Sequence, residues 1–210
     1  MRLLVIGAHG KVGQHLVKFA VEQGIDTVAM VRRKEQETTM KKKGANVVLA
    51  DLEKDFIHAF NDCNVVVFTA GSGSSTGPDK TITVDQQGAI RSIQLAKTQK
   101  LNHFVMISAQ GARNPEAATR IQHYFKAKKI ADDYLIESDV PYTILRPGRL
   151  NDDEFNGKIS IHRHFDHKGT TSRANLAMTA LLTINHPNCL NQIIEVFDGT
   201  TTIQEAVTNF

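Results

Sequence analysis

Short apolar runs alternate with amphipathic stretches along the first 150 residues of the chain. The longest runs are continuous rather than alternating, as is typical of strands that helices cover on both faces. The apolar pattern predicts strands at residues 3–6, 27–31, 47–49, 65–69, 103–107 and 142–145. The run at 65–69 is the most β-prone in the chain, which places it in the interior of a sheet.

Helices are predicted between these strands. Val12, Leu16, Phe19 and Ala20 recur on one helical face, and Gly24 is a suitable stop. A solvated helix is predicted over 34–43 and a long helix over 84–98, which a glycine- and serine-rich loop at 71–78 precedes. Asn114, Pro115 and Glu116 predict the start of a helix that runs to about Glu137. A last strand at 193–197 and a helix at 202–207 close the sheet.

This alternation predicts an α/β fold, a doubly wound parallel sheet with right-handed crossovers. Residues 1–210 are expected to form a single domain with a short C-terminal extension. In such sheets, ligands bind beyond the carboxyl ends of the strands, at the point where the strand order reverses. The loops that follow the strands are therefore the places to search for a site.

The loop after the first strand carries glycines spaced three apart, at Gly7, Gly10 and Gly13. Such glycines permit a tight turn, close approach of the backbone to a pyrophosphate, and close helix–strand packing. His9, Lys11 and Val12 lie within the same loop and are expected to contact the cofactor with it. The alternative is a glycine-rich turn that binds nothing. The strand before the loop and the helix after it favour a dinucleotide.

The loops after the second and third strands contain candidate contacts to an adenosine. An NAD site usually places an acid about 20 residues after the glycines. Here the chain has Arg32 and Arg33, which suit the 2′-phosphate of NADP, although both arginines could instead be ordinary surface residues. Asp51 can accept a hydrogen bond from the adenine amino group while Leu52 packs on the ring. Asp51 can equally cap a helix over 54–60, and the two roles are compatible.

Tyr124 and Lys128 are four residues apart on the predicted fifth helix, so they share one face. In such a pair the lysine lowers the pKa of the phenol and binds the nicotinamide ribose, and the tyrosine passes a proton to a carbonyl. Ser108 stands at the end of the strand before this helix. The alternative for the pair is a half-buried tyrosine beside a surface lysine.

Together these features resemble the short-chain dehydrogenase/reductase superfamily. The chain is similar to its atypical, small NAD(P)-binding group, which is related to biliverdin/flavin reductase and to nitrogen-metabolite-regulator-like redox sensors. The motifs that carry the resemblance are Gly7-x-x-Gly10-x-x-Gly13, Thr69-Ala70-Gly71-Ser72-Gly73, Thr76-Gly77-Pro78-Asp79-Lys80, Val84-Asp85, Tyr124 with Ala127-Lys128, and residues 142–148.

The resemblance implies a Rossmann domain with NADP across the strand ends. In that arrangement Ala70 and Gly71 back the cofactor, Ser108 faces the nicotinamide, and Pro147 and Gly148 line the carboxamide side together with Arg146. The chain departs from catalytic relatives in two ways. It has Ala109 where they commonly carry a second hydroxyl, and only residues 149–210 follow the last motif, which implies a shallow substrate site.

The expected function is an NADP(H)-dependent reductase of a small carbonyl, quinone or flavin-like compound, with Tyr124, Lys128 and Ser108 as catalytic residues. One alternative is a non-catalytic NADP(H)-binding sensor that reports redox state to a partner protein. The other is a relative of the nucleotide-sugar epimerases and dehydratases, which the short C-terminal part argues against. Turnover by hydride transfer separates the reductase from the sensor.

A histidine-rich stretch in the last third contains His162, His164 and His167. Histidines two apart on a strand share a face and could hold a metal with a third ligand. Because no acid or cysteine stands at a typical spacing, no metal is expected. These residues are predicted to be surface histidines, although one could overhang the nicotinamide.

Charge and composition argue against several classes of partner and site. The net charge of +3 is not concentrated in any run, which argues against nucleic-acid binding. No apolar stretch approaches the roughly 18 residues of a membrane span, and the two cysteines form no framework or metal spacing. The sequence thus predicts a cytoplasmic protein with reduced thiols. The expected partners are a small-molecule substrate and, as a possible assembly, a second copy of the chain in a homodimer.

Overall fold

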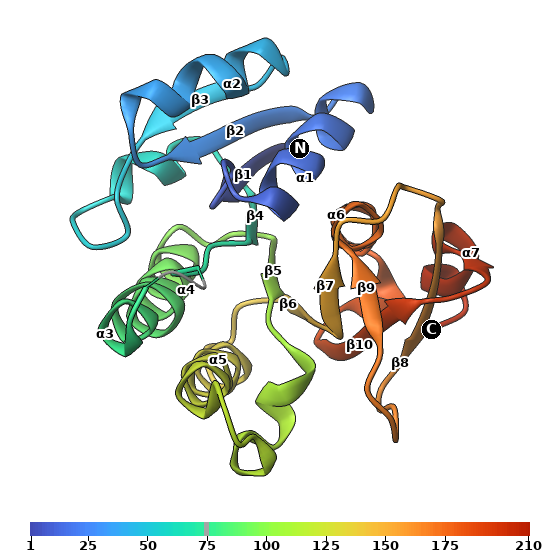
Figure 1. Cartoon of the computed structure of the whole chain (residues 1–210). Coiled ribbons are helices and arrows are strands. Elements are labelled where there is room, and N and C mark those ends of the chain that lie inside the picture. Colours follow the sequence, from blue (N-terminus) through green and yellow to red (C-terminus); the bar gives the residue numbers. More distant parts are fainter. Residues whose placement is uncertain (74–75) are drawn as a thin grey trace.

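A mostly parallel sheet of nine strands, in the order β11-β8-β10-β6-β5-β4-β1-β2-β3, forms the centre of the fold (Figure 1). The computed structural model describes residues 1–73 and 76–210, so Ser74 and Ser75 of the predicted loop lie outside it. The strands are β1 (Arg2–Ile6), β2 (Asp26–Val31), β3 (Asn46–Leu49), β4 (Val65–Phe68), β5 (His103–Ile107), β6 (Tyr142–Pro147), β8 (Lys158–His162), β10 (Gln192–Asp198) and β11 (Thr201–Thr202). The predicted strands and the α/β class are confirmed.

Helices cover both faces of the sheet, with α4 and α5 on one side and α1 and α6 on the other (Figure 1). The helices are α1 (Lys11–Glu22), α2 (Glu37–Lys42), α3 (Pro78–Lys80), α4 (Ala89–Thr98), α5 (Gln122–Ile136), α6 (Arg173–Leu182) and α7 (Ile203–Thr208). A π-helical segment, Thr81–Gly88, joins α3 to α4, and short 3₁₀ helices span Lys34–Gln36, Ile57–Phe60, Gln110–Arg113, Pro115–Ala117 and Pro187–Cys189.

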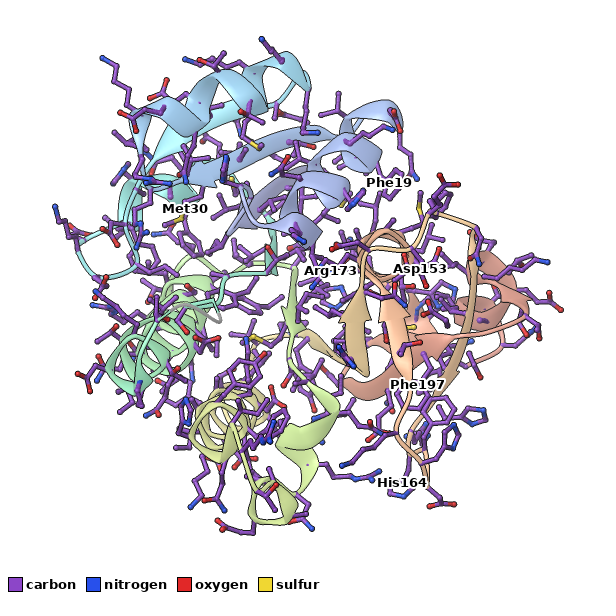
Figure 2. All side chains as sticks on the ribbon, in the orientation of Figure 1. Phe19, Met30, Asp153, His164, Arg173 and Phe197 are labelled. Atoms are coloured by element: carbon purple, nitrogen blue, oxygen red, sulfur yellow. The ribbon has the colours of Figure 1, made fainter. Side chains whose placement is uncertain are left out.

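The core explains why the strands are continuously apolar. Along β4, Val65 and Val67 join the hydrophobic cluster under α1 and α6, while Val66 and Phe68 join the cluster under α4 and α5. All of these side chains are fully buried. Side chains accordingly fill the space on both faces of the sheet (Figure 2).

The strand order reverses at β1. The chain passes from β1 to β2 and β3 on one side, and then crosses back to place β4 against the other edge of β1. All pairings from β3 to β10 are parallel, whereas β8 runs antiparallel to both β10 and β11. The carboxyl ends of β1 and β4 therefore meet at the predicted switch point.

The predicted helix from Asn114 to Glu137 is wrong in its first part. Asn114 makes no side-chain cap bond, and the 3₁₀ helix that follows it ends at Ala117, since Ala118 is extended at φ −89° and ψ 127°. Pro115 is buried, and Gly111 packs so closely on the Phe125 ring that a Cβ would lie 2.5 Å from ring atoms. The segment thus folds back on α5 and cannot be collinear with it.

Residues after Gly148 extend the sheet. A two-stranded parallel ladder of β7 (Arg149–Asn151) and β9 (Thr170–Ser172) stands beside it, and α6 packs against α1. The sequence indicated the last strand and helix but not β7, β9 or α6. Ser172 caps α6 by accepting from the Asn175 backbone N–H.

Candidate functional site

A cavity of about 420 Å³ opens at the carboxyl ends of β1 and β4, where the strand order reverses. The residues around it come from five separate parts of the chain. They are Ile6, Gly7, His9 and Gly10; Met30, Val31, Arg32 and Gln36; Ala50, Asp51 and Leu52; Thr69, Ala70, Gly71 and Ser72; and Thr76, Lys80 and Val84. The cavity thus includes many residues predicted to bind a cofactor.

The glycine loop forms one wall. Gly7 has φ +83°, and a Cβ there would lie 2.6 Å from the Ala70 backbone nitrogen. A Cβ at Gly13 would lie 2.4 Å from the Gly7 carbonyl oxygen, so Gly13 allows α1 to pack on β1. At Gly10 the nearest such atom is the Gly7 oxygen at 3.1 Å, and the residue is exposed at the start of α1. A turn that is tightest at both ends and exposed to solvent at its middle fits a pyrophosphate at a helix N-terminus.

The end of β2 brings Arg32 to the cavity, whereas Arg33 is exposed and is not among the described residues that line it. The backbone N–H groups of both arginines donate to Gln36 Oε1, at 3.1 Å each. Gln36 therefore fixes the turn that carries them.

Asp51 and Leu52, in the segment after β3, form another part of the cavity wall. Asp51 Oδ1 accepts a hydrogen bond of 3.0 Å from the Glu53 backbone N–H, which closes a turn. The next helix begins only at Ile57, so the alternative of a helix cap at Asp51 is wrong. Leu52 is buried and packs on Gly88, where a Cβ would lie 3.2 Å from its side chain.

Ala70 and Gly71 form the floor after β4. A Cβ at Gly71 would lie 3.1 Å from Asp85 Oδ1, and the other oxygen of Asp85 accepts from the Ser72 backbone N–H at 2.9 Å. Asp85 belongs to the π-helical segment and is fully buried. It connects this loop to the next cluster of polar residues.

Tyr124 and Lys128 share one face of α5, as predicted from their spacing. The Lys128 ammonium is buried, lies 3.5 Å from Asp85 Oδ1, and donates to the Ile107 carbonyl oxygen at 3.2 Å. It also lies 5.9 Å from the centre of the Tyr124 ring. Lys128 therefore belongs to a buried ionic cluster near the ends of β4 and β5, with the half-buried Tyr124 beside it.

The pKa of Tyr124 is raised from its ordinary value, because burial of the phenolate outweighs the favourable charge of Lys128. Lys128 therefore lowers the phenol pKa as expected, but its effect is smaller than that of burial, and the net shift is upward. Burial alone would lower the pKa of Lys128, but the neighbouring Tyr124, Asp85 and Asp132 together raise it. At neutral pH the lysine is charged and the phenol carries its proton.

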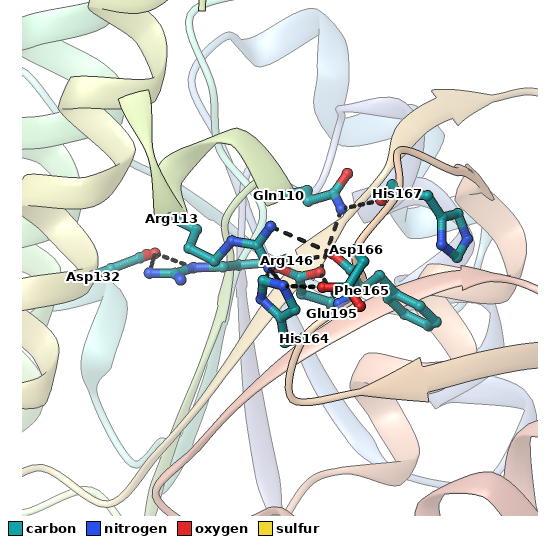
Figure 3. A network of polar contacts seen from close by, with 9 residues as sticks. All are labelled: Gln110, Arg113, Asp132, Arg146, His164, Phe165, Asp166, His167 and Glu195. Atoms are coloured by element: carbon teal, nitrogen blue, oxygen red, sulfur yellow. Dashed lines mark hydrogen bonds and ion pairs between the residues drawn. The ribbon is translucent and has the colours of Figure 1, made fainter. Parts of the chain in front are cut away.

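Ser108 lies buried at the end of β5, where its hydroxyl donates to Asp132 Oδ2 at 2.8 Å. The same oxygen accepts from Arg146 Nε and Nη2, at 3.0 Å each, and Figure 3 shows this ion pair. Burial raises the pKa of Asp132, and Arg146 and Ser108 oppose that shift. The hydroxyl proton of Ser108 is thus held inside the protein.

The remaining predicted cofactor contacts lie outside the cavity lining. The Gly148 N–H donates to Val196 O at 3.2 Å and to Thr171 Oγ1 at 3.0 Å, and a Cβ there would lie 2.2 Å from Gly169 O. Pro147 is buried at the end of β6, and Val12 packs in the core. Lys11 is exposed and pairs with Asp152 at 2.6 Å.

The histidines of the last third meet aromatic rings and an arginine. His164 pairs with Asp166 at 2.8 Å and contacts Arg113 (Figure 3). His162 and His167 pack on the Phe165 ring. Within residues 1–73 and 76–210, no group of three or more histidine, cysteine or acidic side chains is arranged to hold a metal ion.

Sequence reasoning missed a buried carboxylate on β10. Glu195 is 1% exposed and accepts from Arg113 Nη1 at 3.0 Å, from the Phe165 N–H at 2.9 Å and from Gln110 Nε2 at 3.3 Å (Figure 3). It fastens the segment after β5 to the loop before β9. In the sequence, this carboxylate could be noticed as a single glutamate within the otherwise apolar run 193–197. Asp132 could have been noticed because it lies four residues beyond Lys128 on the same helix.

Within residues 1–73 and 76–210, no helix combines the length and the apolar character needed to cross a membrane.

Comparison with known proteins places residues 7–187 in the profile of a family described as NAD(P)H-binding. The chain is 36% identical over 212 residues to a protein of Bacillus subtilis (strain 168) described as the uncharacterized sugar epimerase YhfK, and the match covers 99% of both chains. It is 39% identical to a solved protein of Bacillus halodurans described as a putative NAD-dependent epimerase/dehydratase, with a TM-score of 0.97 and full coverage of both chains.

A more distant solved structure shares the fold. ChuY of Escherichia coli O157:H7, described as an anaerobilin reductase, is 21% identical and has a TM-score of 0.79, with 96% of this chain and 99% of that chain covered. At this identity the likeness concerns the arrangement of strands and helices alone.

Proposed function

The chain belongs to the NAD(P)H-binding family, and on this premise we propose that it is an NADP(H)-dependent reductase of a small carbonyl, quinone or flavin-like substrate. We also assign it to the atypical short-chain dehydrogenase/reductases. The observation that carries the proposal is the cavity at the strand switch point, with the glycine turn at one wall and Arg32 in its lining.

The residues around the cavity suit the adenosine end of NADP. The turn at Gly7 and Gly10 would hold the pyrophosphate, and Arg32 would hold the 2′-phosphate with its planar, permanently charged guanidinium. Asp51 would accept from the adenine amino group, with Leu52 against the ring. A bound NADPH supplies a hydride to the acceptor.

Tyr124 would provide the proton. Because burial keeps the phenol protonated, Tyr124 is in the form that can donate. Lys128, held by Asp85 and the Ile107 carbonyl, stabilises the phenolate that remains after the transfer. Ser108 is the weaker candidate for a donor, since its hydroxyl already donates to Asp132.

An epimerase or dehydratase, the description given to the two Bacillus relatives, is less well supported by the geometry. A nucleotide-sugar substrate is large, whereas the residues after Gly148 here add β8, β10, α6 and α7 to the central sheet and its core. That part of the chain is used mainly to complete the fold.

A non-catalytic NADP(H) sensor is the second candidate, and one observation favours it. The polar groups expected to act on a substrate are engaged within the protein: Lys128 with Asp85, and Ser108 with Asp132. A protein that only binds NADP(H) would need no free donor at that place.

Oxidation of NADPH in the presence of flavin mononucleotide, a benzoquinone and an aldehyde tests the proposal. A reductase consumes NADPH with at least one of them, and Tyr124→Phe slows the reaction by roughly 10²–10⁴-fold with NADPH affinity unchanged. Tyr134→Phe is the matched control, because Tyr134 lies on the same helix and its hydroxyl accepts a hydrogen bond from Gln94 Nε2 near the surface.

The outcomes separate the candidates. No oxidation with any of the three acceptors, while NADPH binds, contradicts the reductase and supports the sensor. Turnover that Tyr124→Phe leaves unchanged contradicts the role of Tyr124 and indicates proton delivery from water.

A further inference from the structure

An ion pair borders the cavity at its adenosine end. Lys80 Nζ, at the end of α3, contacts both carboxylate oxygens of Glu53, at 2.7 and 2.8 Å. Lys80 itself lines the cavity, and Glu53 follows Asp51 and Leu52 in the turn of the opposite wall. The pair therefore joins two segments that are far apart in sequence across the edge of the proposed cofactor site.

Arg32 and Lys80 both line the cavity, and Lys80 holds the Glu53 carboxylate at the cavity edge. The Lys80 ammonium makes the largest contribution to lowering the pKa of Glu53, and the Arg32 guanidinium lowers it as well. Arg32 and Lys80 thus act on the same carboxylate, and Arg32 is the residue to which the 2′-phosphate is assigned above.

A carboxylate beside Arg32 is unfavourable for NADP. It can form a charge-assisted pair with the guanidinium, which then competes with the phosphate, and its own charge repels a dianionic phosphate monoester. A free ribose hydroxyl, as in NAD, is little affected by that charge. Whether Glu53 is neutralised therefore decides how well the 2′-phosphate is tolerated.

We propose that the Glu53–Lys80 pair is a specificity-determining element of the cofactor site: Lys80 occupies the Glu53 carboxylate and so leaves Arg32 free for the 2′-phosphate. This inference rests on the proposed function, since it concerns the preference of the same site for NADP over NAD. Lys80 acts on the selection without having to touch the phosphate. The side chains of Lys80 and Glu53 are 48% and 27% exposed, so the effect is moderate and weakens with salt.

Calorimetric titration with NADP⁺ and with NAD⁺ at low ionic strength tests the proposal. Lys80→Met should weaken NADP⁺ binding by about fivefold and NAD⁺ binding by less than about twofold, the size expected for a partly screened charge. Glu53→Gln should leave NADP⁺ binding as tight as in the unaltered protein or tighter. Combining Glu53→Gln with Lys80→Met should restore the NADP⁺-to-NAD⁺ ratio, because no carboxylate then remains to compete.

Lys97→Met is the matched control, because Lys97 makes an exposed pair with Asp139 and is not a cavity residue. It should leave the ratio unchanged. An exposed ion pair contributes little to stability, so the variants should fold, and Lys80→Gln is a second variant if Lys80→Met does not.

Equal weakening of NADP⁺ and NAD⁺ in Lys80→Met would overturn the proposal, since it would show that the pair only braces the two walls of the cavity. The same holds if the double variant keeps the altered ratio. If the unaltered protein binds neither dinucleotide, the proposed function itself fails, and this inference fails with it.

Discussion

Arg32 and Arg33 are neighbours in the chain, but only Arg32 is among the residues that line the cavity. A charge-assisted bond to a phosphate contributes about 1.5–3 kcal/mol. Arg32→Ala should therefore weaken NADP⁺ binding by about tenfold or more and leave NAD⁺ binding nearly unchanged, as measured by calorimetry. Arg33→Ala, the adjacent control, should have a smaller effect.

A larger loss of NADP⁺ affinity in Arg33→Ala than in Arg32→Ala would place the 2′-phosphate outside the cavity described here. Both arginines are exposed, so neither change should lower the thermal midpoint appreciably.

His103 makes the stability of the protein depend on pH. Its Nδ1 accepts from the Asn185 backbone N–H at 2.7 Å, so the proton of the neutral ring is on Nε2 and faces Thr143 Oγ1 at 3.0 Å. Burial lowers the pKa of His103 to about 4. A proton on Nδ1 would place two donors against each other.

In the unfolded chain the His103 ring is protonated as the pH falls through its ordinary pKa of 6.5, whereas in the folded protein it is protonated only as the pH falls through about 4. Stability is lost as the pH falls through this window, by about 2–3 kcal/mol between about pH 7 and pH 4.5. Urea unfolding at both pH values measures the difference in the free energy of unfolding between about pH 7 and pH 4.5. This difference should be smaller by about 2–3 kcal/mol in His103→Gln and unchanged in His123→Gln, which alters an exposed histidine. An equal pH dependence in all three proteins would contradict the assignment.

At the scale of elements, the turn between β1 and α1 separates binding from folding. A Cβ at Gly10 would lie 3.1 Å from the Gly7 carbonyl oxygen, whereas a Cβ at Gly13 would lie 2.4 Å from that oxygen and 2.8 Å from Ala8 Cα. Gly10→Val should therefore abolish dinucleotide binding and lower the thermal midpoint less than Gly13→Ala does. Gly13→Ala should lower the midpoint, because the helix must move off the strand, at a cost of about 1–3 kcal/mol.

Calorimetry together with thermal unfolding of both variants checks this contrast. Normal NADP⁺ affinity in Gly10→Val would show that the loop is a structural turn and that the cofactor binds elsewhere.

Elements with a clear period were predictable and elements held by tertiary contacts were not. The runs that form β1, β2, β4 and β5 are continuously apolar, and a strand covered on both faces buries all of their side chains. These strands could therefore be predicted from the local sequence. The start of α5 was misplaced because Asn114 and Pro115 form a local helix-start signal. The packing of Gly111 on Phe125, which turns the segment back on α5, cannot be seen in the local sequence. The short strands β7 and β9 depend on pairing with each other, which no local pattern encodes.

At the scale of the whole molecule, the location of the cavity could be predicted because it depends on topology. Once β1 lies between β2 and β4, the loops after residues 6, 31, 49 and 69 meet at one edge of the sheet. The ionic clusters could not be predicted, since each joins residues from separate elements. Ser108 stands at the end of β5, Asp132 lies on α5 and Arg146 on β6, while Glu195 of β10 pairs with Arg113 of the segment after β5.

We propose the cavity at the carboxyl ends of β1 and β4 as an NADP(H) site in which Arg32 selects the 2′-phosphate. Calorimetric titration of the unaltered protein with NADP⁺ and NAD⁺ under identical conditions tests it most directly. The account predicts NADP⁺ binding at least about tenfold tighter, a difference of about 1.4 kcal/mol. Equal affinities, or tighter binding of NAD⁺, would contradict it.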